Sequence, residues 1–75
     1  MNWLELPPLA SLRAFSAFAE TGNVSLAGDA LNVSHAAISQ QLRALEVHLG
    51  ASLLDRSGRS LSLTVEGDQL ARALD

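Results

Sequence analysis

The chain has no cysteine and no lysine, and its only aromatic residues are one tryptophan and two phenylalanines. Without cysteine there is no disulfide scaffold, thiolate zinc site or thiol nucleophile, which fits a reducing compartment. With so few aromatic side chains the core has to be built mainly from Leu, Val, Ile and Ala, which is typical of packed helices. Without lysine, every cationic contact is made by arginine, which suits bidentate pairing with phosphate or guanine.

A length of 75 residues leaves room for one modest core and little for an enclosed active site. A large pocket would compete with the core for the same side chains. No serine has a partner arrangement that supports a nucleophile, and His35 and His48 lack further ligands at metal-binding spacing. The sequence therefore predicts a binding module, with no enzymatic activity, metal or cofactor.

Long apolar runs are missing as well. No stretch reaches the roughly 18 uninterrupted apolar residues of a transmembrane helix. Pro7, Pro8 and Arg13 interrupt the first segment, which has no basic leader. We expect a soluble protein of the cytoplasm.

The apolar residues of the first half predict two helices. The first helix ends at Gly22, and its apolar positions recur at steps of three or four: Leu9, Leu12, Phe15, Phe18 and Ala19. Ser25 is a good N-cap and predicts a short second helix over residues 26–31.

Asn32 then interrupts the pattern, and asparagine tolerates the left-handed conformation of a tight turn. Ser34 is expected to cap a third helix over residues 35–49, and Gly50 stands where a helix C-terminus often places glycine. One stripe of this helix is apolar: Ile38, Leu42, Leu45 and Leu49.

The last third of the chain predicts a hairpin and one more helix. Leu53-Leu54 and the alternation Leu61-Ser62-Leu63 indicate two short strands joined by a turn at residues 57–60. Thr64 is expected to cap a helix that starts at Val65, with Glu66 in its first turn.

Residues 28–39 have the layout of a helix-turn-helix. It has a small residue where two helices cross, a turn residue, two side chains that fill the junction, and a cap: Gly28, Asn32, Val33, Ile38 and Ser34. We expect alanine to fit at position 28 and leucine to overpack the junction. With the hairpin as a wing, the pattern predicts a mainly α, winged helix-turn-helix fold.

With the flanking residues added, the chain resembles the N-terminal DNA-binding domain of the LysR-type transcriptional regulators over nearly its whole length. The matching segments are the first helix, the entry to the second, the recognition helix, and the wing with its exit: residues 9–20, 23–28, 33–46 and 53–67. The resemblance implies a three-helix core with a short two-stranded wing over residues 1–64. Residues 65–75 would begin a dimerising linker helix.

The resemblance also implies a function, which is sequence-specific binding of double-stranded DNA for transcription regulation. A recognition helix over residues 34–49 would enter the major groove, and a wing over residues 53–64 would lie on the backbone or minor groove. The partners implied are a second copy of the chain, joined through the helix near Val65, and a small-molecule effector bound by a separate domain.

Some positions depart from the family pattern. Val24 and Leu54 stand where phenylalanine is usual, and Gly28 stands where alanine is usual. Gln40 and Asp55 replace residues that are frequently basic, so the expected DNA-facing surface is less positive. These departures weaken the expectation of tight non-specific binding and leave the fold intact.

Nine residues are candidates for DNA contact. Most occupy the start and polar side of the third helix, where Ala36 would offer a methyl contact to thymine and Gln40 would pair with adenine. Arg56 and Arg59 flank the wing turn, where a cation reaches phosphate or the minor groove. The full set is Ser25, Ser34, His35, Ala36, Ser39, Gln40, Arg43, Arg56 and Arg59.

The net charge of −3 is the main observation against nucleic acid, because a DNA footprint is normally basic. It supports the alternative of a winged-helix module that binds another protein through the same third helix. Charge placement reduces the objection, since Arg43, Arg56 and Arg59 all lie in the second half.

Overall fold

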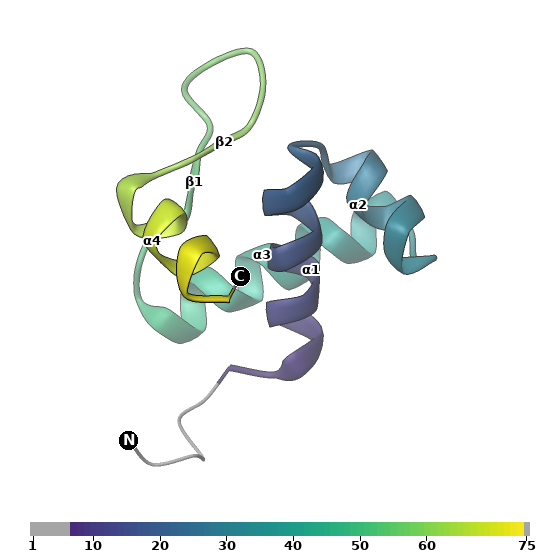
Figure 1. Cartoon of the computed structure of the whole chain (residues 1–75), viewed down its shortest axis with the longest axis horizontal. Helices are drawn as coiled ribbons and strands as arrows, with labels where there is room; N and C mark the ends of the chain where they lie inside the picture. Colours follow the sequence, from purple (N-terminus) through teal and green to yellow (C-terminus); the bar gives the residue numbers. More distant parts are fainter. Residues whose placement is uncertain (1–6, 75) are drawn as a thin grey trace.

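The computed structural model describes residues 7–74, which form four helices and one two-stranded antiparallel sheet (Figure 1). The single tryptophan, Trp3, lies outside the described residues, and so do two of the acidic residues that contribute to the net charge, Glu5 and Asp75. So do the first six residues of the predicted DNA-binding domain and the last residue of the predicted linker helix. Within residues 7–74 no helix is long and apolar enough to cross a membrane.

Helix α1 (Leu9–Thr21) supplies the two phenylalanines of the core, Phe15 and Phe18. It ends where predicted, because Gly22 adopts a left-handed conformation with φ 71° and its N–H donates to the Phe18 carbonyl. Leu9 departs from the predicted stripe, since it is 71% exposed in the first turn.

Helix α2 (Val24–Leu31) begins two residues earlier than residues 26–31 predicted. Asn23 has the extended conformation of an N-cap, and its Oδ1 accepts the Leu26 N–H at 3.0 Å. The prediction of Ser25 as the cap was therefore wrong, because Asn23 makes the capping bond and Ser25 already lies in the first helical turn. Asn32 has the predicted left-handed conformation, with φ 59°.

Helix α3 (His35–Leu49) has the predicted bounds. The Ser34 Oγ accepts the Ala37 N–H at 3.0 Å, and Gly50 ends the helix at φ 66°. Ile38, Leu42 and Leu45 are buried, but Leu49 is 42% exposed, so the stripe leaves the core one turn before the helix ends.

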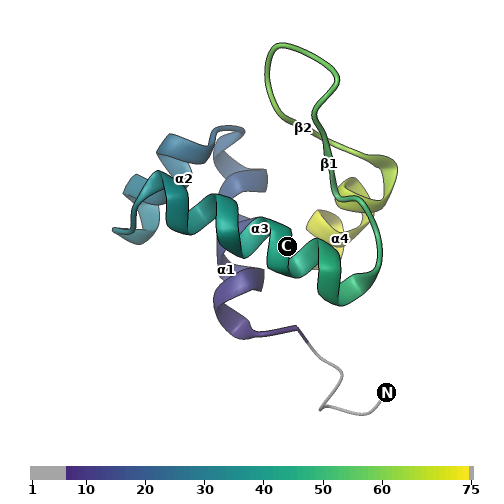
Figure 2. The same cartoon turned by 180° about the vertical axis from the view of Figure 1, so that it is seen from behind.

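The three helices enclose one core, with α3 crossing α1 and α2 as Figures 1 and 2 show from opposite sides. The α2–α3 junction is tighter than the sequence indicated. A Cβ on Gly28 would lie 2.8 Å from the Val33 carbonyl oxygen. Since this atom belongs to the backbone, the expectation that alanine simply fits at position 28 was wrong, and the turn has to shift to accept it.

The first wing strand is shifted by one residue from the predicted Leu53-Leu54, and the second is one residue shorter than predicted. β1 (Leu54–Asp55) pairs with β2 (Ser62–Leu63), with Leu54 opposite Leu63. Leu53 and Leu61 lie just outside the ladder. The loop between the strands projects from the helical body, as both views show.

Helix α4 (Val65–Leu74) returns from the wing and packs on α1 and β2. Thr64 caps it as predicted, because its Oγ1 accepts the Gly67 N–H at 3.0 Å. The same Oγ1 donates to the Ser52 carbonyl at 2.7 Å, which ties the start of α4 to the segment before β1. A Cβ on Gly67 would overlap the Leu53 carbonyl oxygen.

Candidate nucleic-acid interface

The outer face of α3 is mostly polar up to Arg43, and one turn further along it carries the exposed Val47. Because Ile38, Leu42 and Leu45 point into the core, the helix turns the opposite residues outward. Ser39 on this face is half-buried, and the other predicted residues of the helix and its cap are exposed: Ser34, His35, Ala36, Gln40 and Arg43. This stretch contains no acidic residue, so the face is neutral to positive although the chain is acidic.

Ser25 belongs to the same surface although it is not a cap. Its Oγ lies 3.5 Å from the His35 Nδ1, which places the first turn of α2 beside the first turn of α3. Both side chains are exposed. The structure thus brings together seven of the nine predicted contact residues on the starts of two helices and the outer face of α3.

Arg59 lies in the exposed wing loop, and like Arg43 it makes no hydrogen bond or ion pair with the described residues. The wing also carries a fixed negative charge. Asp55 Oδ1 accepts from the Ser57 hydroxyl at 2.6 Å and from the Ser57 N–H at 2.9 Å. These two hydrogen bonds lower the pKa of Asp55, because they favour its charged form.

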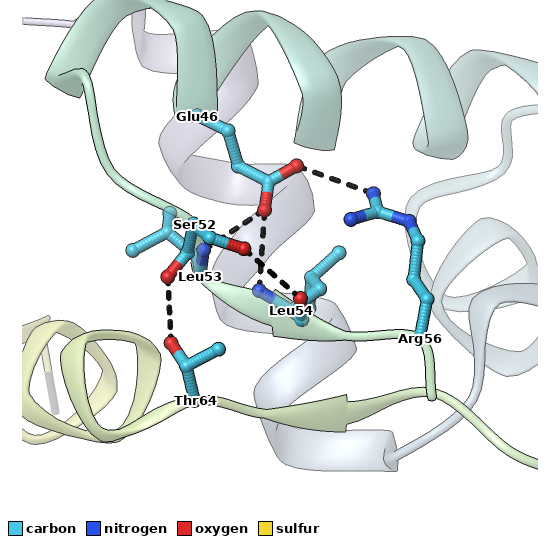
Figure 3. Close-up of polar contacts among 6 residues, drawn as sticks. All are labelled: Glu46, Ser52, Leu53, Leu54, Arg56 and Thr64. Atoms are coloured by element: carbon cyan, nitrogen blue, oxygen red, sulfur yellow. Dashed lines mark hydrogen bonds and ion pairs between the residues drawn. The ribbon is translucent and has the colours of Figure 1, made fainter. Parts of the chain in front are cut away.

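Arg56, predicted to contact DNA from beside the wing turn, is paired with an acidic side chain of α3. Its Nη2 lies 3.2 Å from Glu46 Oε1 on α3 (Figure 3). The second oxygen of the same carboxylate accepts the N–H groups of Leu53 at 2.8 Å and Leu54 at 3.2 Å. One carboxylate therefore joins α3 to the base of the wing and to Arg56.

The environment of Glu46 favours the ionised carboxylate. Burial alone raises its pKa, since the side chain is only 14% exposed. The hydrogen bonds from the Leu53 N–H, the Arg56 guanidinium and the Leu54 N–H outweigh that effect and lower the pKa. Arg56 itself keeps 46% of its side chain exposed, so it remains open to a further partner.

Two parts of this arrangement were not predicted from the sequence. The sequence analysis included Glu46 only as one residue of a matching segment, although a carboxylate near the end of α3 followed by an arginine ten residues later is a usable signal. The second is a partly buried hydrogen bond at 2.7 Å from the Ser11 hydroxyl to Gln41 Oε1, which joins α1 to α3. Its signal is a serine surrounded by the apolar positions of an amphipathic helix.

Comparison with known proteins finds one family over most of the chain. The family model described as "Bacterial regulatory helix-turn-helix protein, lysR family" matches residues 9–68. The AhcY transcriptional activator HvrB of Rhodobacter capsulatus is 51% identical over 74 residues, which cover 99% of this chain and 25% of that protein. The HTH-type transcriptional regulator TrpI of Pseudomonas aeruginosa is 45% identical over 69 residues, covering 92% of this chain and 23% of that protein.

Solved structures agree with the sequence comparison. The BenM DNA-binding domain, in a crystal structure with catB site 1 DNA, superposes with a TM-score of 0.82 at 33% identity. That match covers 88% of this chain and 74% of the BenM domain. The fold is therefore the winged helix of these domains, as predicted. The relatives named above are transcriptional regulators rather than enzymes, and this chain spans about a quarter of their length.

Proposed function

The chain belongs to the lysR family of bacterial regulatory helix-turn-helix proteins, and we propose that it binds double-stranded DNA sequence-specifically to regulate transcription. The observation that carries this proposal is the exposed surface of residues 34–43, which is mostly polar, contains no acidic residue and is flanked by a projecting wing; Arg56 and Arg59 lie between the two wing strands. A BenM domain of the same fold has been crystallised with DNA, which supports it. Such a regulator would act in the cytoplasm.

In this proposal α3, with its cap Ser34, enters the major groove. A groove about 12 Å wide admits one helix, and the exposed Ala36 and Gln40 are the side chains that would reach base edges. Ala36 would contact a thymine methyl group, and Gln40 would pair with adenine. Arg43, with no partner among residues 7–74, would bind phosphate or guanine.

The wing, residues 53–64, would lie on the backbone or in the minor groove. Arg59 has no partner in the described structure, and Arg56 is half-exposed beside Glu46. At the start of α2, Ser25 would contact a phosphate, since helix N-termini favour anions. These contacts position the domain, and the contacts of α3 with base edges supply the specificity.

We also propose that two copies bind one inverted repeat, joined through the helix that begins at Val65. Leu70 packs on the core, whereas Leu74 is exposed at the end of the described helix and is available to a second copy. Sedimentation with an inverted-repeat duplex is expected to give two copies per duplex. If one copy binds each duplex, whether the duplex carries an inverted repeat or a single half-site, the proposed pairing is wrong. A small-molecule effector would bind outside these residues.

The experiment that tests DNA binding is a titration of a mixed-sequence duplex and of duplexes selected from a random library, at several salt concentrations. Phosphate neutralisation releases counterions, so affinity is expected to fall steeply as salt rises. Selected duplexes should bind more tightly than mixed sequence. If the chain binds no duplex and instead binds another protein without salt dependence, the protein-interaction alternative holds.

A further inference from the structure

We propose that Glu46 is a positioning residue for DNA binding, because it holds Arg56 and the base of the wing in the place from which Arg56 contacts a phosphate. This inference rests on the DNA binding proposed above. It goes further because it states that an acidic residue, whose charge should repel DNA, increases the affinity of the chain for DNA.

The first argument is the number of donors that Glu46 collects. Its Oε2 accepts two consecutive backbone N–H groups of Leu53 and Leu54, and its Oε1 accepts the Arg56 guanidinium. Charged acceptors with several donors form strong and directional hydrogen bonds. Figure 3 shows the Arg56 side chain extending from the chain just after β1 to lie beside the Glu46 carboxylate.

The second argument is location. Glu46 lies three residues after Arg43 on α3, and residues three apart share one side of a helix. Glu46 therefore links the outer face of α3 with the wing, the two surfaces that would contact DNA. By pairing with Arg56 it limits the positions that the guanidinium can adopt. An ordered side chain loses less conformational entropy when it binds.

The third argument is what remains of Arg56 after pairing. One terminal nitrogen faces Glu46, while the planar guanidinium has five N–H donors in a fixed fork. The side chain is 46% exposed. Arg56 is thus able to donate to a phosphate while it stays bonded to Glu46.

The wing does not depend on Glu46 alone, so variants at this position are suited to testing. The Thr64 N–H donates to the Leu53 carbonyl at 3.0 Å, and the Thr64 hydroxyl donates to the Ser52 carbonyl. The β1–β2 pairing adds a further constraint. Glu46→Gln removes the charge and so weakens the bond to Arg56, while these contacts persist.

The matched control is Asp68→Asn, which makes the same change of charge and removes an ion pair away from the wing, Asp68 Oδ2 to Arg72 Nε at 2.8 Å on α4. The probe is a mixed-sequence duplex titrated at several salt concentrations. Glu46→Gln is expected to bind about tenfold more weakly than Asp68→Asn and to lose about one unit of salt slope, as Arg56→Ala does. Because the two residues act as a unit, the double variant should bind no more weakly than Arg56→Ala.

Equal or tighter binding by Glu46→Gln than by Asp68→Asn would mean that Glu46 competes with DNA for Arg56, and the inference would be wrong. Additive effects in the double variant would also overturn it. If Glu46→Gln does not fold, the inference is tested with Arg56→Lys, since lysine keeps the charge but lacks the planar fork of N–H donors. The Arg56→Lys variant should bind the duplex more weakly than the unaltered chain, and equal binding would contradict the inference. If the unaltered chain binds no duplex, the proposed function fails instead.

Discussion

The Ser11 hydroxyl donates a hydrogen bond of 2.7 Å to Gln41 Oε1, and it does so from a position with no exposed surface. This bond crosses the core between α1 and the middle of α3. It fixes the position of α3, which carries the proposed DNA-facing residues, along α1. Apolar packing alone would allow the two helices to shift relative to each other. A buried polar pair of this kind specifies one arrangement of two helices.

Ser11→Ala should therefore destabilise the chain by about 1–2 kcal/mol, because it leaves the Gln41 carbonyl without its buried donor. Urea denaturation measures the loss. Ser16→Ala is the control, since Ser16 lies exposed on the same helix and its loss should be within about 0.5 kcal/mol of zero. Equal effects of the two substitutions would show that the buried bond adds nothing to stability.

The caps of α2 make a second prediction. Asn23→Ala should cost about 1 kcal/mol, because the Leu26 N–H loses its acceptor. Ser25→Ala should be neutral or slightly stabilising, since alanine has the higher helix propensity inside a helix. Thermal unfolding of both variants checks this, and a larger loss for Ser25→Ala would place the start of α2 at Ser25.

Gly67 and Gly28 make a third prediction, because both approach backbone carbonyls closely. Gly67→Ala should destabilise by about 2–3 kcal/mol, since the new Cβ overlaps the Leu53 carbonyl oxygen and pushes α4 from the wing. Gly28→Ala should cost less, about 1 kcal/mol, because its contact is looser and alanine gains helix propensity.

Gly58→Ala is the control for both glycine variants, since the nearest atom to its added Cβ is 3.8 Å away. It should be close to neutral in urea denaturation. The ranking Gly67, Gly28, Gly58 is the test, and a Gly67→Ala variant as stable as Gly58→Ala would contradict the close approach of α4 to Leu53.

The sequence predicts best those features that short-range chemistry determines. The bounds of α3 follow from Ser34 and Gly50, one residue at each end whose local bonding stops the helix. The start of α2 was missed because Asn23 and Ser25 are both good caps, and only the backbone path after Gly22 selects between them. Composition cannot make that selection.

Part of the candidate site could likewise be predicted from the sequence, and part could not. The outer face of α3 follows from helical periodicity, because burying Ile38 and Leu42 exposes the opposite side. The ion pair between Glu46 and Arg56 depends on how residues 50–53 turn back along α3. No periodic pattern in the sequence predicts the course of that turn. A sequence with Arg56 beside a hairpin turn therefore indicated a free cation where the fold makes a pair.

The last prediction concerns acid, and it follows from the lowered pKa of Glu46. In the unfolded chain a glutamate has a pKa of about 4.3. Because the folded chain holds this carboxylate ionised to lower pH, the unfolded state binds more protons between the two pKa values, and stability rises with pH across that interval. The contribution is fully present above the unfolded pKa and is lost as pH falls through the folded pKa.

The difference in unfolding free energy between the unaltered chain and Glu46→Gln isolates this contribution from Asp55, whose pKa is also lowered. Above about pH 5 the difference should be constant, at roughly 1–2 kcal/mol for hydrogen bonds to a charged acceptor. Below the unfolded pKa it should shrink, because the protonated carboxyl resembles the amide that replaces it. Urea denaturation at a series of pH values measures both curves. A difference that persists unchanged into acid would mean that the Glu46 charge contributes nothing, and that only the shape of the side chain stabilises the base of the wing.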